Sequence, residues 1–339
     1  MAQSTDVVIV GAGASGLRLA GILQRAGIDS KILEGRDRIG GRLLTVDPGI
    51  DLGASWFWQN EKDVLEVISE SDILTFPQHA AGNMMFQIPG SVKQLEGNPL
   101  DQQAWRIIGG MQSLVSTLAQ ALSPKTIKLS TSVTGIEFKN EITVNTNQGD
   151  WLAKHIVLAL PPVTALANIT FTPELPADLV KVAKQTPVWM GAITKVVAIY
   201  DSPFWRSKGL AGSAMSHVGP LREIHDISDE KATFGALFGF SRGEVVEHEV
   251  IAQLVELFGA QASSPRQLIV KNWSTSKFTS PPEVSDLNNY QLFGSAELRA
   301  PYFDGQLYFS STETSIDAPG HIQGAFSAAR RTANALLNT

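Results

Sequence analysis

The feature that most constrains the fold is a short apolar run that leads directly into a glycine-rich turn. Residues 7–10 are all apolar, residues 11–16 read GAGASG, and a helical stretch rich in alanine and leucine follows. This spacing is typical of a dinucleotide-binding turn. The first glycine allows the tight turn, the second lets the backbone approach a pyrophosphate, and the third lets the helix pack on the strand. The helix N-terminus then favours the anionic pyrophosphate.

An acidic residue ends the second predicted strand. Residues 30–33 precede Glu34, which stands 18 positions after Gly16. A carboxylate at this place accepts hydrogen bonds from both ribose hydroxyls and disfavours a 2′-phosphate. The sequence therefore predicts a Rossmann-type nucleotide site and argues against NADP.

The segment after the second strand indicates which dinucleotide is bound. Residues 34–42 read EGRDRIGGR, which resembles the signature of the flavin-containing amine oxidase family, a group that includes monoamine, polyamine and L-amino-acid oxidases. Two glycines let this loop lie against the cofactor, and Arg42 offers a forked, charged donor set to a diphosphate. The resemblance extends over residues 6–337 and implies FAD as the cofactor.

Further motifs extend this resemblance along the chain. Residues 51–56 resemble the family's Asp-x-Gly-x-x-Trp stretch along the flavin ring system, where small residues allow close backbone approach. The resemblance also places Val133 against the adenine, and it directs the start of the last helix, after residue 319, at the flavin N1 and C2 carbonyl region. The predicted cofactor-binding residues are Gly11, Gly13, Ala14, Ser15, Gly16, Glu34, Gly35, Arg36, Gly41, Arg42, Leu43, Gly53, Ala54, Ser55, Trp56, Val133, Glu313 and Ile322.

The implied fold class is α/β, with an FAD-binding Rossmann-like domain of the GR2 type and an inserted α+β substrate domain built on a mixed sheet. Alternation predicts a hairpin around residues 147–149, and a buried parallel strand at 155–160 is stopped by two prolines. Long strands and covering helices follow these prolines. We expect the FAD-binding domain at residues 1–72, 104–160 and 296–339, and the substrate or cap domain at 73–103 and 161–295.

The family usually has a helical cap near residues 76–100. Here this stretch is short, rich in Gly, Pro, Gln and Asn, and has no clear period. The sequence therefore predicts a reduced lid and a more open active site.

Composition excludes several kinds of protein. A chain of 339 residues with 43% apolar and 18% charged residues suits about two domains with sizeable cores. A net charge of −6 without basic runs argues against nucleic acid as a partner. The chain has no cysteine, so disulfides and a cysteinyl-flavin bond are excluded, and FAD should be held non-covalently. The six histidines show no metal-ligand spacing, so we expect no metal.

The N-terminal residues carry no export signal, and no apolar run reaches the roughly 18 to 20 residues of a membrane span. We therefore expect a cytoplasmic protein without a membrane partner. The sequence does not indicate its oligomeric state.

Three residues are candidates for the chemistry. Asn168 aligns with the lysine that, in most amine oxidases of the resembled family, holds a water against flavin N5. Asparagine can orient water but brings no positive charge. His321 stands where relatives often have an aromatic-sandwich tyrosine, and it either exchanges a proton at neutral pH or only packs on the cofactor. Trp273 is either substrate wall or core. A full aromatic cage is not supported, because Phe278, Pro281 and Pro282 give no clear second aromatic match.

Two classes of function remain open. The preferred one is an FAD-dependent oxidoreductase that oxidises an amine C–N bond to an imine, with dioxygen as the acceptor and hydrogen peroxide as the product. Variants are a renalase-like oxidation of reduced nicotinamides and a flavin desaturase with a non-oxygen acceptor. The other class is a module that holds FAD without turnover. The expected partner is a small-molecule substrate, and the sequence does not identify it.

Overall fold

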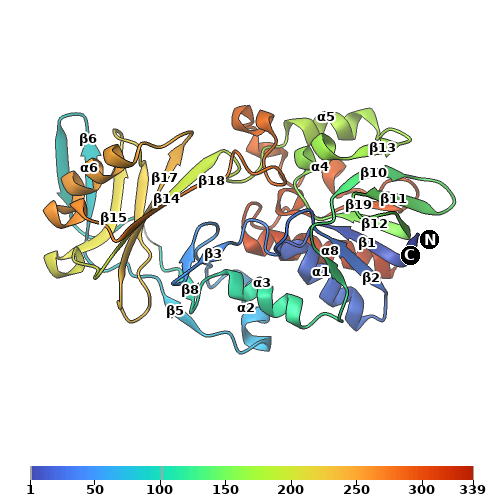
Figure 1. Cartoon of the computed structure of the whole chain (residues 1–339), viewed down its shortest axis with the longest axis horizontal. Helices are drawn as coiled ribbons and strands as arrows, with labels where there is room; N and C mark the ends of the chain where they lie inside the picture. Colours follow the sequence, from blue (N-terminus) through green and yellow to red (C-terminus); the bar gives the residue numbers. More distant parts are fainter. Residues whose placement is uncertain (1, 101, 339) are drawn as a thin grey trace.

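An eight-stranded sheet organises one end of the molecule, and both chain termini lie at this end (Figure 1). The computed structural model describes residues 2–100 and 102–338. The strand order is β13-β10-β11-β12-β1-β2-β9, with β19 also paired to β12. The strands are β1 (Gln3–Val10), β2 (Ser30–Leu33), β9 (Ile127–Lys128), β10 (Val133–Glu137), β11 (Ile142–Thr146), β12 (Trp151–Leu158), β13 (Thr170–Thr172) and β19 (Leu307–Phe309).

Strand β12 joins two strands that the sequence predicts as separate. Its first residues pair antiparallel with β11, and its last residues pair parallel with β19, while β1 runs parallel along its other edge. No glycine or proline interrupts residues 151–158, so the hairpin strand continues directly into the buried strand. β12 therefore lies in the middle of the sheet.

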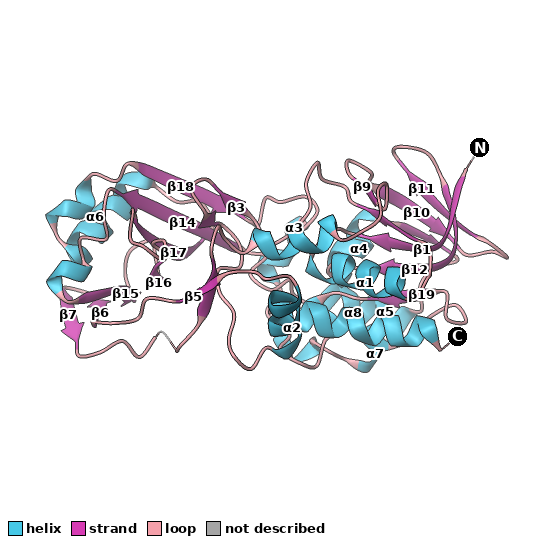
Figure 2. Cartoon of the chain, turned by 90° about the horizontal axis from the view of Figure 1, so that it is seen from below, coloured by secondary structure: helices cyan, strands magenta, loops and turns pink. Residues whose placement is uncertain are grey.

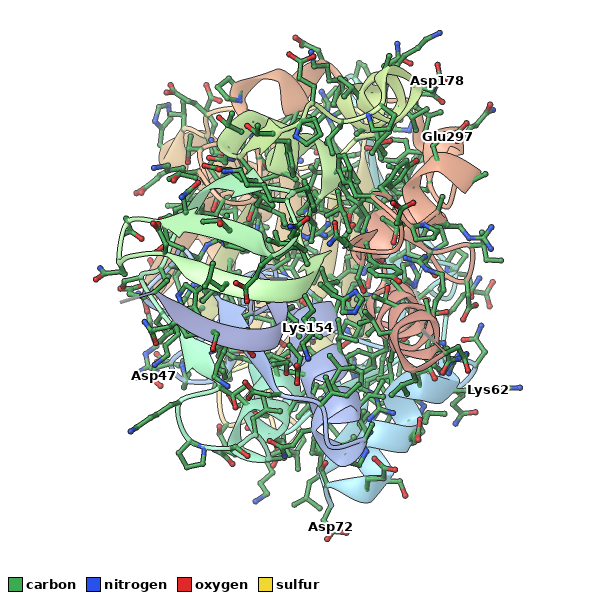
Figure 3. The ribbon with its side chains drawn as sticks, turned by 90° about the vertical axis from the view of Figure 1, so that its right-hand side faces the viewer. Asp47, Lys62, Asp72, Lys154, Asp178 and Glu297 are labelled. Carbon is green, nitrogen blue, oxygen red and sulfur yellow. The ribbon has the colours of Figure 1, made fainter. Side chains whose placement is uncertain are left out.

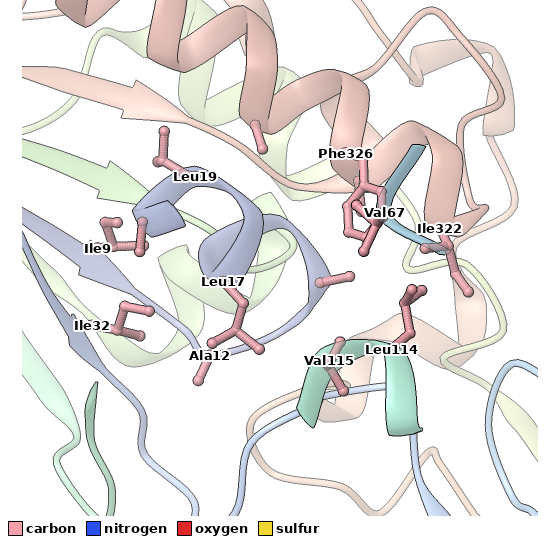
Figure 4. Close-up of a cluster of buried hydrophobic side chains, with 14 of the residues drawn as sticks. Ile9, Ala12, Leu17, Leu19, Ile32, Val67, Leu114, Val115, Ile322 and Phe326 are labelled. Atoms are coloured by element: carbon pink, nitrogen blue, oxygen red, sulfur yellow. The ribbon is translucent and has the colours of Figure 1, made fainter. Parts of the chain in front are cut away.

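Helices cover both faces of this sheet because the side chains of β1 alternate between two cores. Val7 and Ile9 belong to one core with α1 (Ala14–Arg25), α2 (Lys62–Glu70), α3 (Gln112–Gln120) and α8 (Ile322–Leu337). Figure 4 shows this core, with Leu17 of α1, Leu114 of α3 and Phe326 of α8 among the labelled side chains. Val8 and Val10 belong to the second core, with α4 (Pro162–Asn168), α5 (Ala177–Gln185) and α7 (Ala296–Arg299).

A seven-stranded mixed sheet forms the other lobe (Figure 2). Its pairs are antiparallel except for the parallel pair of β6 and β15. The order is β18 (Gln267–Asn272), β14 (Ile193–Tyr200), β17 (Gly235–Arg242), β16 (Glu223–Asp226), β15 (Leu210–Ser216), β6 (Asn83–Ile88) and β7 (Ser91–Leu95). Helix α6 (Glu247–Phe258) covers one face, where it packs on Val196, Ala198 and Tyr200. The alternate residues Val197 and Ile199 pack on the other face against Ile50 and Leu52.

Short elements complete the chain. Two two-stranded sheets pair β3 (Thr45–Val46) with β4 (Ile50–Asp51), and β5 (Thr75–Pro77) with β8 (Trp105–Ile107). The 3-10 turns are η1 (Arg206–Lys208), η2 (Ala260–Ser263), η3 (Pro282–Asp286), η4 (Tyr290–Leu292) and η5 (Thr312–Thr314).

The chain departs from the expected domain division in the segment that follows Pro161. The predicted boundary assigns 161–185 to the substrate domain, but β13 pairs with β10 and both α4 and α5 pack in the second core of the first sheet. Phe171 and Leu179 bring this segment back to the first sheet. The two prolines therefore end a strand without ending the domain.

The segment without a clear period also contains regular structure. Residues 83–95 form the β6–β7 hairpin, and β6 extends the second sheet by pairing with β15. The sequence does not show this hairpin because its strands are half-exposed and do not alternate cleanly. A more open active site stays a prediction.

At the end of the first lobe, charged side chains such as Lys154, Asp178 and Glu297 lie on the surface (Figure 3). Among the described residues, no helix is both long enough and apolar enough to span a membrane.

Candidate active site

A cavity of about 340 Å³ runs from the glycine-rich turn to the inner face of the second sheet. It brings together segments that are far apart in the chain: the β1–α1 turn, residues 34–43 and 52–58, the start of β10, α4, β14, β17 and the start of α8. Of the predicted site residues, only Gly16 and Glu313 do not line it. The other predicted residues therefore lie around one cavity, and their roles in binding or catalysis remain predictions.

The glycine-rich turn has the backbone geometry that a pyrophosphate requires. Gly11 has φ +106°, a conformation that only glycine adopts without strain, and a Cβ on Gly16 would lie 2.1 Å from the Gly11 carbonyl oxygen. A Cβ on Gly13 would meet no protein atom within 4 Å. Gly13 caps α1 and lines the cavity, so the open space beside it fits a ligand phosphate at the helix N-terminus.

Glu34 is held by backbone groups at the end of β2. Its side chain is buried, and its two oxygens accept hydrogen bonds from the N–H groups of Ala12 (2.8 Å) and Arg36 (2.9 Å). Oε1 also accepts from the Arg36 guanidinium (3.5 Å), whereas Oε2 keeps a further lone pair for a ribose hydroxyl. The turn and this carboxylate therefore fit the ADP part of FAD.

Arg42 makes a contact that the sequence does not indicate. Its guanidinium holds Glu313 through two hydrogen bonds of 2.7 and 3.1 Å and also donates to the Trp189 carbonyl. Glu313 is fully buried. The expected free charge for a diphosphate is therefore largely compensated by Glu313, and this pair joins the loop after β2 to η5 and to the loop before β14.

Phe278 lies at the nucleotide end of the cavity. Its ring packs on Gly35, where a Cβ would come within 2.8 Å of the ring, and Arg36 lies over the ring and donates to Thr279 (2.6 Å). Phe278 therefore contacts the signature loop, which explains why it matched no aromatic position of a substrate cage.

The opposite end of the cavity is aromatic. Trp56 packs on Phe238 with ring centroids 5.5 Å apart, and Phe240 follows Phe238 along the same face of β17. Trp273 also lines the cavity, and its indole N–H donates to the Leu52 carbonyl (2.9 Å). Trp273 is thus both core and cavity wall.

Lys195 of β14 is a buried lysine that is not among the residues predicted from the sequence. Its ammonium donates to the Gly53 carbonyl (3.1 Å) and the Ser55 hydroxyl (2.5 Å) and lies 3.9 Å from the centroid of the Phe238 ring. Burial lowers the pKa of Lys195 to about 7, against the opposing effect of Asp51. The alternation of β14 places Lys195 on the same face as the buried Val197. A lysine in register with buried apolar residues is the sequence signal for this site.

His321 lies in an aromatic and acidic environment. Its ring stacks on Trp58, with centroids 5.0 Å apart, and Trp189 lies 6.2 Å away. Its Nδ1 is 3.1 Å from the buried carboxylate of Glu61. Trp189 is fixed against Gly320, where a Cβ would lie 2.6 Å from the indole. The sequence pattern indicates His321 but gives no signal for Trp58, Trp189 or Glu61.

Asn168 ends α4 and lines the cavity. Its amide donates to the Thr164 carbonyl one turn earlier (2.8 Å), which leaves its carbonyl oxygen and one N–H for other partners. Among the described residues, no group of three or more His, Cys, Asp or Glu side chains could hold a metal ion.

Comparisons with known proteins agree with this geometry. Residues 92–337 match the family model for flavin-containing amine oxidoreductases, and residues 9–71 match the model for an NAD(P)-binding Rossmann-like domain. A probable flavin-containing monoamine oxidase A of Dictyostelium discoideum is 24% identical, with 100% of both chains covered. A putrescine oxidase of Kocuria rosea is 23% identical and covers 79% of this chain and 78% of its own.

Solved structures confirm the α/β fold. Wild-type putrescine oxidase bound to putrescine superposes with a TM-score of 0.87, at 21% identity and with 100% of both chains covered. Cyclohexylamine oxidase from Brevibacterium oxydans IH-35A gives 0.85 at 22% identity, with 98% of this chain and 99% of its own covered. The family and the site together establish FAD as the cofactor. The chain belongs to the flavin-containing amine oxidoreductase family, and it is an FAD-dependent oxidoreductase.

Proposed function

We propose that the protein oxidises an amine with an apolar body to the imine, with dioxygen as the acceptor and hydrogen peroxide as the product. The observation that carries this proposal is the aromatic end of the cavity, which continues from the nucleotide site and ends at Trp56, Phe238 and Phe240. Bound FAD supplies an acceptor for the hydride equivalent that leaves the carbon beside the nitrogen. The protein orients the amine and excludes water.

The chain's own residues favour a monoamine. The amine's apolar body would lie on the rings of Trp56 and Phe238, where a second ammonium would lose its hydration, and the Glu61 carboxylate of the cavity wall is bonded to His321. Lys195 brings a charge of the same sign into this wall. Benzylamine should therefore be a better substrate than putrescine.

Anaerobic stopped-flow mixing tests this proposal. The FAD-loaded enzyme should be bleached at 450 nm by benzylamine much faster than by putrescine, and aerobic turnover should release hydrogen peroxide. Reduced nicotinamide and a saturated substrate for a desaturase serve as comparison reductants. Bleaching by a comparison reductant and by no amine would contradict the proposal. The absence of bleaching with every compound would indicate a module that only holds FAD.

Asn168 provides a separate test of the acceptor. Since asparagine brings no positive charge to stabilise a developing superoxide, reoxidation should be slower than reduction, and Asn168→Lys should accelerate it. Mixing the reduced enzyme with oxygenated buffer measures both rates. Rapid reoxidation of the wild type without a gain in the variant would show that another cation, such as Lys195, already supplies the charge.

A further inference from the structure

Glu61 and His321 form a carboxylate–imidazole pair at the wall of the cavity. Glu61 is the N-cap residue of α2, and His321 is the N-cap residue of α8, so two helix starts meet here. The Glu61 side chain is 5% exposed and that of His321 is 36% exposed. Both residues line the cavity, and the imidazole is the more exposed of the two. We propose that this pair takes the proton from the ammonium form of the substrate before oxidation, an inference that rests on the proposed function.

The hydrogen bonds define which ring nitrogen is available. Glu61 Oε1 lies 3.1 Å from His321 Nδ1, and Oε2 accepts the Trp58 backbone N–H at 3.1 Å. An ionised carboxylate only accepts hydrogen bonds, so Nδ1 carries a proton, and in the neutral imidazole Nε2 then keeps its lone pair. Among the described residues, none forms a hydrogen bond with Nε2. Nε2 is therefore the free acceptor of the pair.

The aromatic neighbours hold the imidazole in place. Trp58 stacks on the ring at an interplanar angle of 25°, and Trp189 approaches at 6.2 Å. The His321 backbone is also fixed, because its carbonyl accepts the Thr312 hydroxyl at 2.9 Å. Indole faces stabilise a cation, so this packing suits an imidazole that becomes protonated.

The charges around His321 leave Glu61 as its direct counter-ion. Glu313 is paired with Arg42, Asp63 is paired with Arg330 and bonded to Gln323, and Lys62 is exposed. With neutral His321 the pair carries a net charge of −1, which attracts an ammonium ion. After proton transfer the pair is neutral overall, and the imidazolium lies beside the carboxylate.

The proton step is balanced within the pair and the substrate. The ammonium N–H bond breaks, its electron pair stays on the substrate nitrogen, and the proton forms a bond to His321 Nε2. The free lone pair on the amine then promotes loss of the hydride equivalent from the adjacent carbon. In this sequence Glu61 is a positioning residue, because it acts on the substrate only through His321.

Two amines of different basicity test the pair in the FAD-loaded enzyme. At pH 7, benzylamine is an ammonium ion, whereas a fluorinated analogue with a pKa below about 6 is already neutral. His321→Ala and Glu61→Gln should slow anaerobic bleaching by benzylamine by about 100-fold, the range of a lost general base. Both variants should leave bleaching by the weakly basic amine within about threefold of the wild type. The exposed His248→Gln is the control and should change neither rate.

A spectroscopic readout separates this proposal from the proposed function. We expect ¹⁵N NMR of the FAD-loaded enzyme to show the Nδ1–H tautomer of His321, and binding of α,α-dimethylbenzylamine, which has no hydrogen to lose, should convert it to imidazolium. Glu61→Gln should weaken both signatures. If no amine bleaches the wild type, the proposed function fails. The NMR titration still shows whether the Glu61–His321 pair takes a proton from a bound ammonium ion.

Equal losses with both amines would overturn the proposal, because they would indicate a packing role for His321. An imidazole that stays neutral when the unreactive amine binds would overturn it as well.

Discussion

At the nucleotide end of the cavity the ligand-facing groups are mainly backbone atoms positioned by glycines, whereas at the aromatic end they are side chains from separate segments. Gly11, Gly13 and Glu34 come from one continuous strand–turn–helix–strand unit. Trp58, Lys195 and His321 come from three segments that meet only in the folded chain. Local chain geometry thus specifies cofactor binding, while substrate choice depends on segments of both lobes that meet at the cavity.

The largest effect is expected when a side-chain carbon is added inside the glycine-rich turn. Gly16→Ala places a Cβ 2.1 Å from the Gly11 carbonyl oxygen, so the protein should fail to fold or melt far below the wild type in a thermal scan. Gly13→Ala is the matched control, because its Cβ meets only open space. It should keep the melting temperature of the apoprotein but lose FAD. Equal behaviour of both variants would contradict the backbone-built site.

The next effect comes from the Arg42–Glu313 ion pair, which joins the loop after β2 to η5. Arg42→Ala leaves the fully buried Glu313 without its partner, which should lower the free energy of unfolding by about 3 kcal/mol in urea titrations of the apoprotein. Adding Glu313→Gln to this variant removes the unpaired charge and should restore part of the loss. An unchanged urea midpoint in Arg42→Ala would show that the pair contributes nothing to stability.

A smaller effect is expected at the ribose. Glu34→Ala removes a charge-assisted acceptor worth about 1.5–3 kcal/mol, so FAD should bind about tenfold more weakly or worse in a fluorescence titration. Asp37→Ala, an exposed acidic position in the same loop, is the control and should leave the affinity unchanged. Retained affinity in Glu34→Ala would place the ribose elsewhere.

The smallest effect, counted per pH unit, concerns the aromatic end. Burial lowers the pKa of Lys195 from 10.5 to about 7. Between these two pH values Lys195 is protonated in the unfolded chain and neutral in the folded chain. Stability should therefore rise with pH in this window, by at most about 1.4 kcal/mol per pH unit. Lys195→Met should reduce the slope between pH 7 and 9.5 in urea unfolding. A slope identical to that of the wild type would show that Lys195 stays charged throughout.

The sequence by itself determined the dinucleotide turn, the acidic end of β2 and the family signature, because each depends on neighbours within a few residues. Gly11 needs a positive φ and Gly16 needs close packing, and both requirements arise inside one strand–turn–helix unit.

Only the tertiary structure decided the domain to which residues 161–185 belong, the pairing of Arg42 with Glu313, and the meeting of Glu61 with His321. These pairs are separated by 271 and 260 positions in the chain, so no local pattern records them. A buried charge needs a partner, but its sequence neighbours do not reveal which one. In the first lobe α8 packs against α2 and η5, which brings Glu61 to His321 and places Glu313 beside Arg42, and the second sheet closes the substrate end of the cavity.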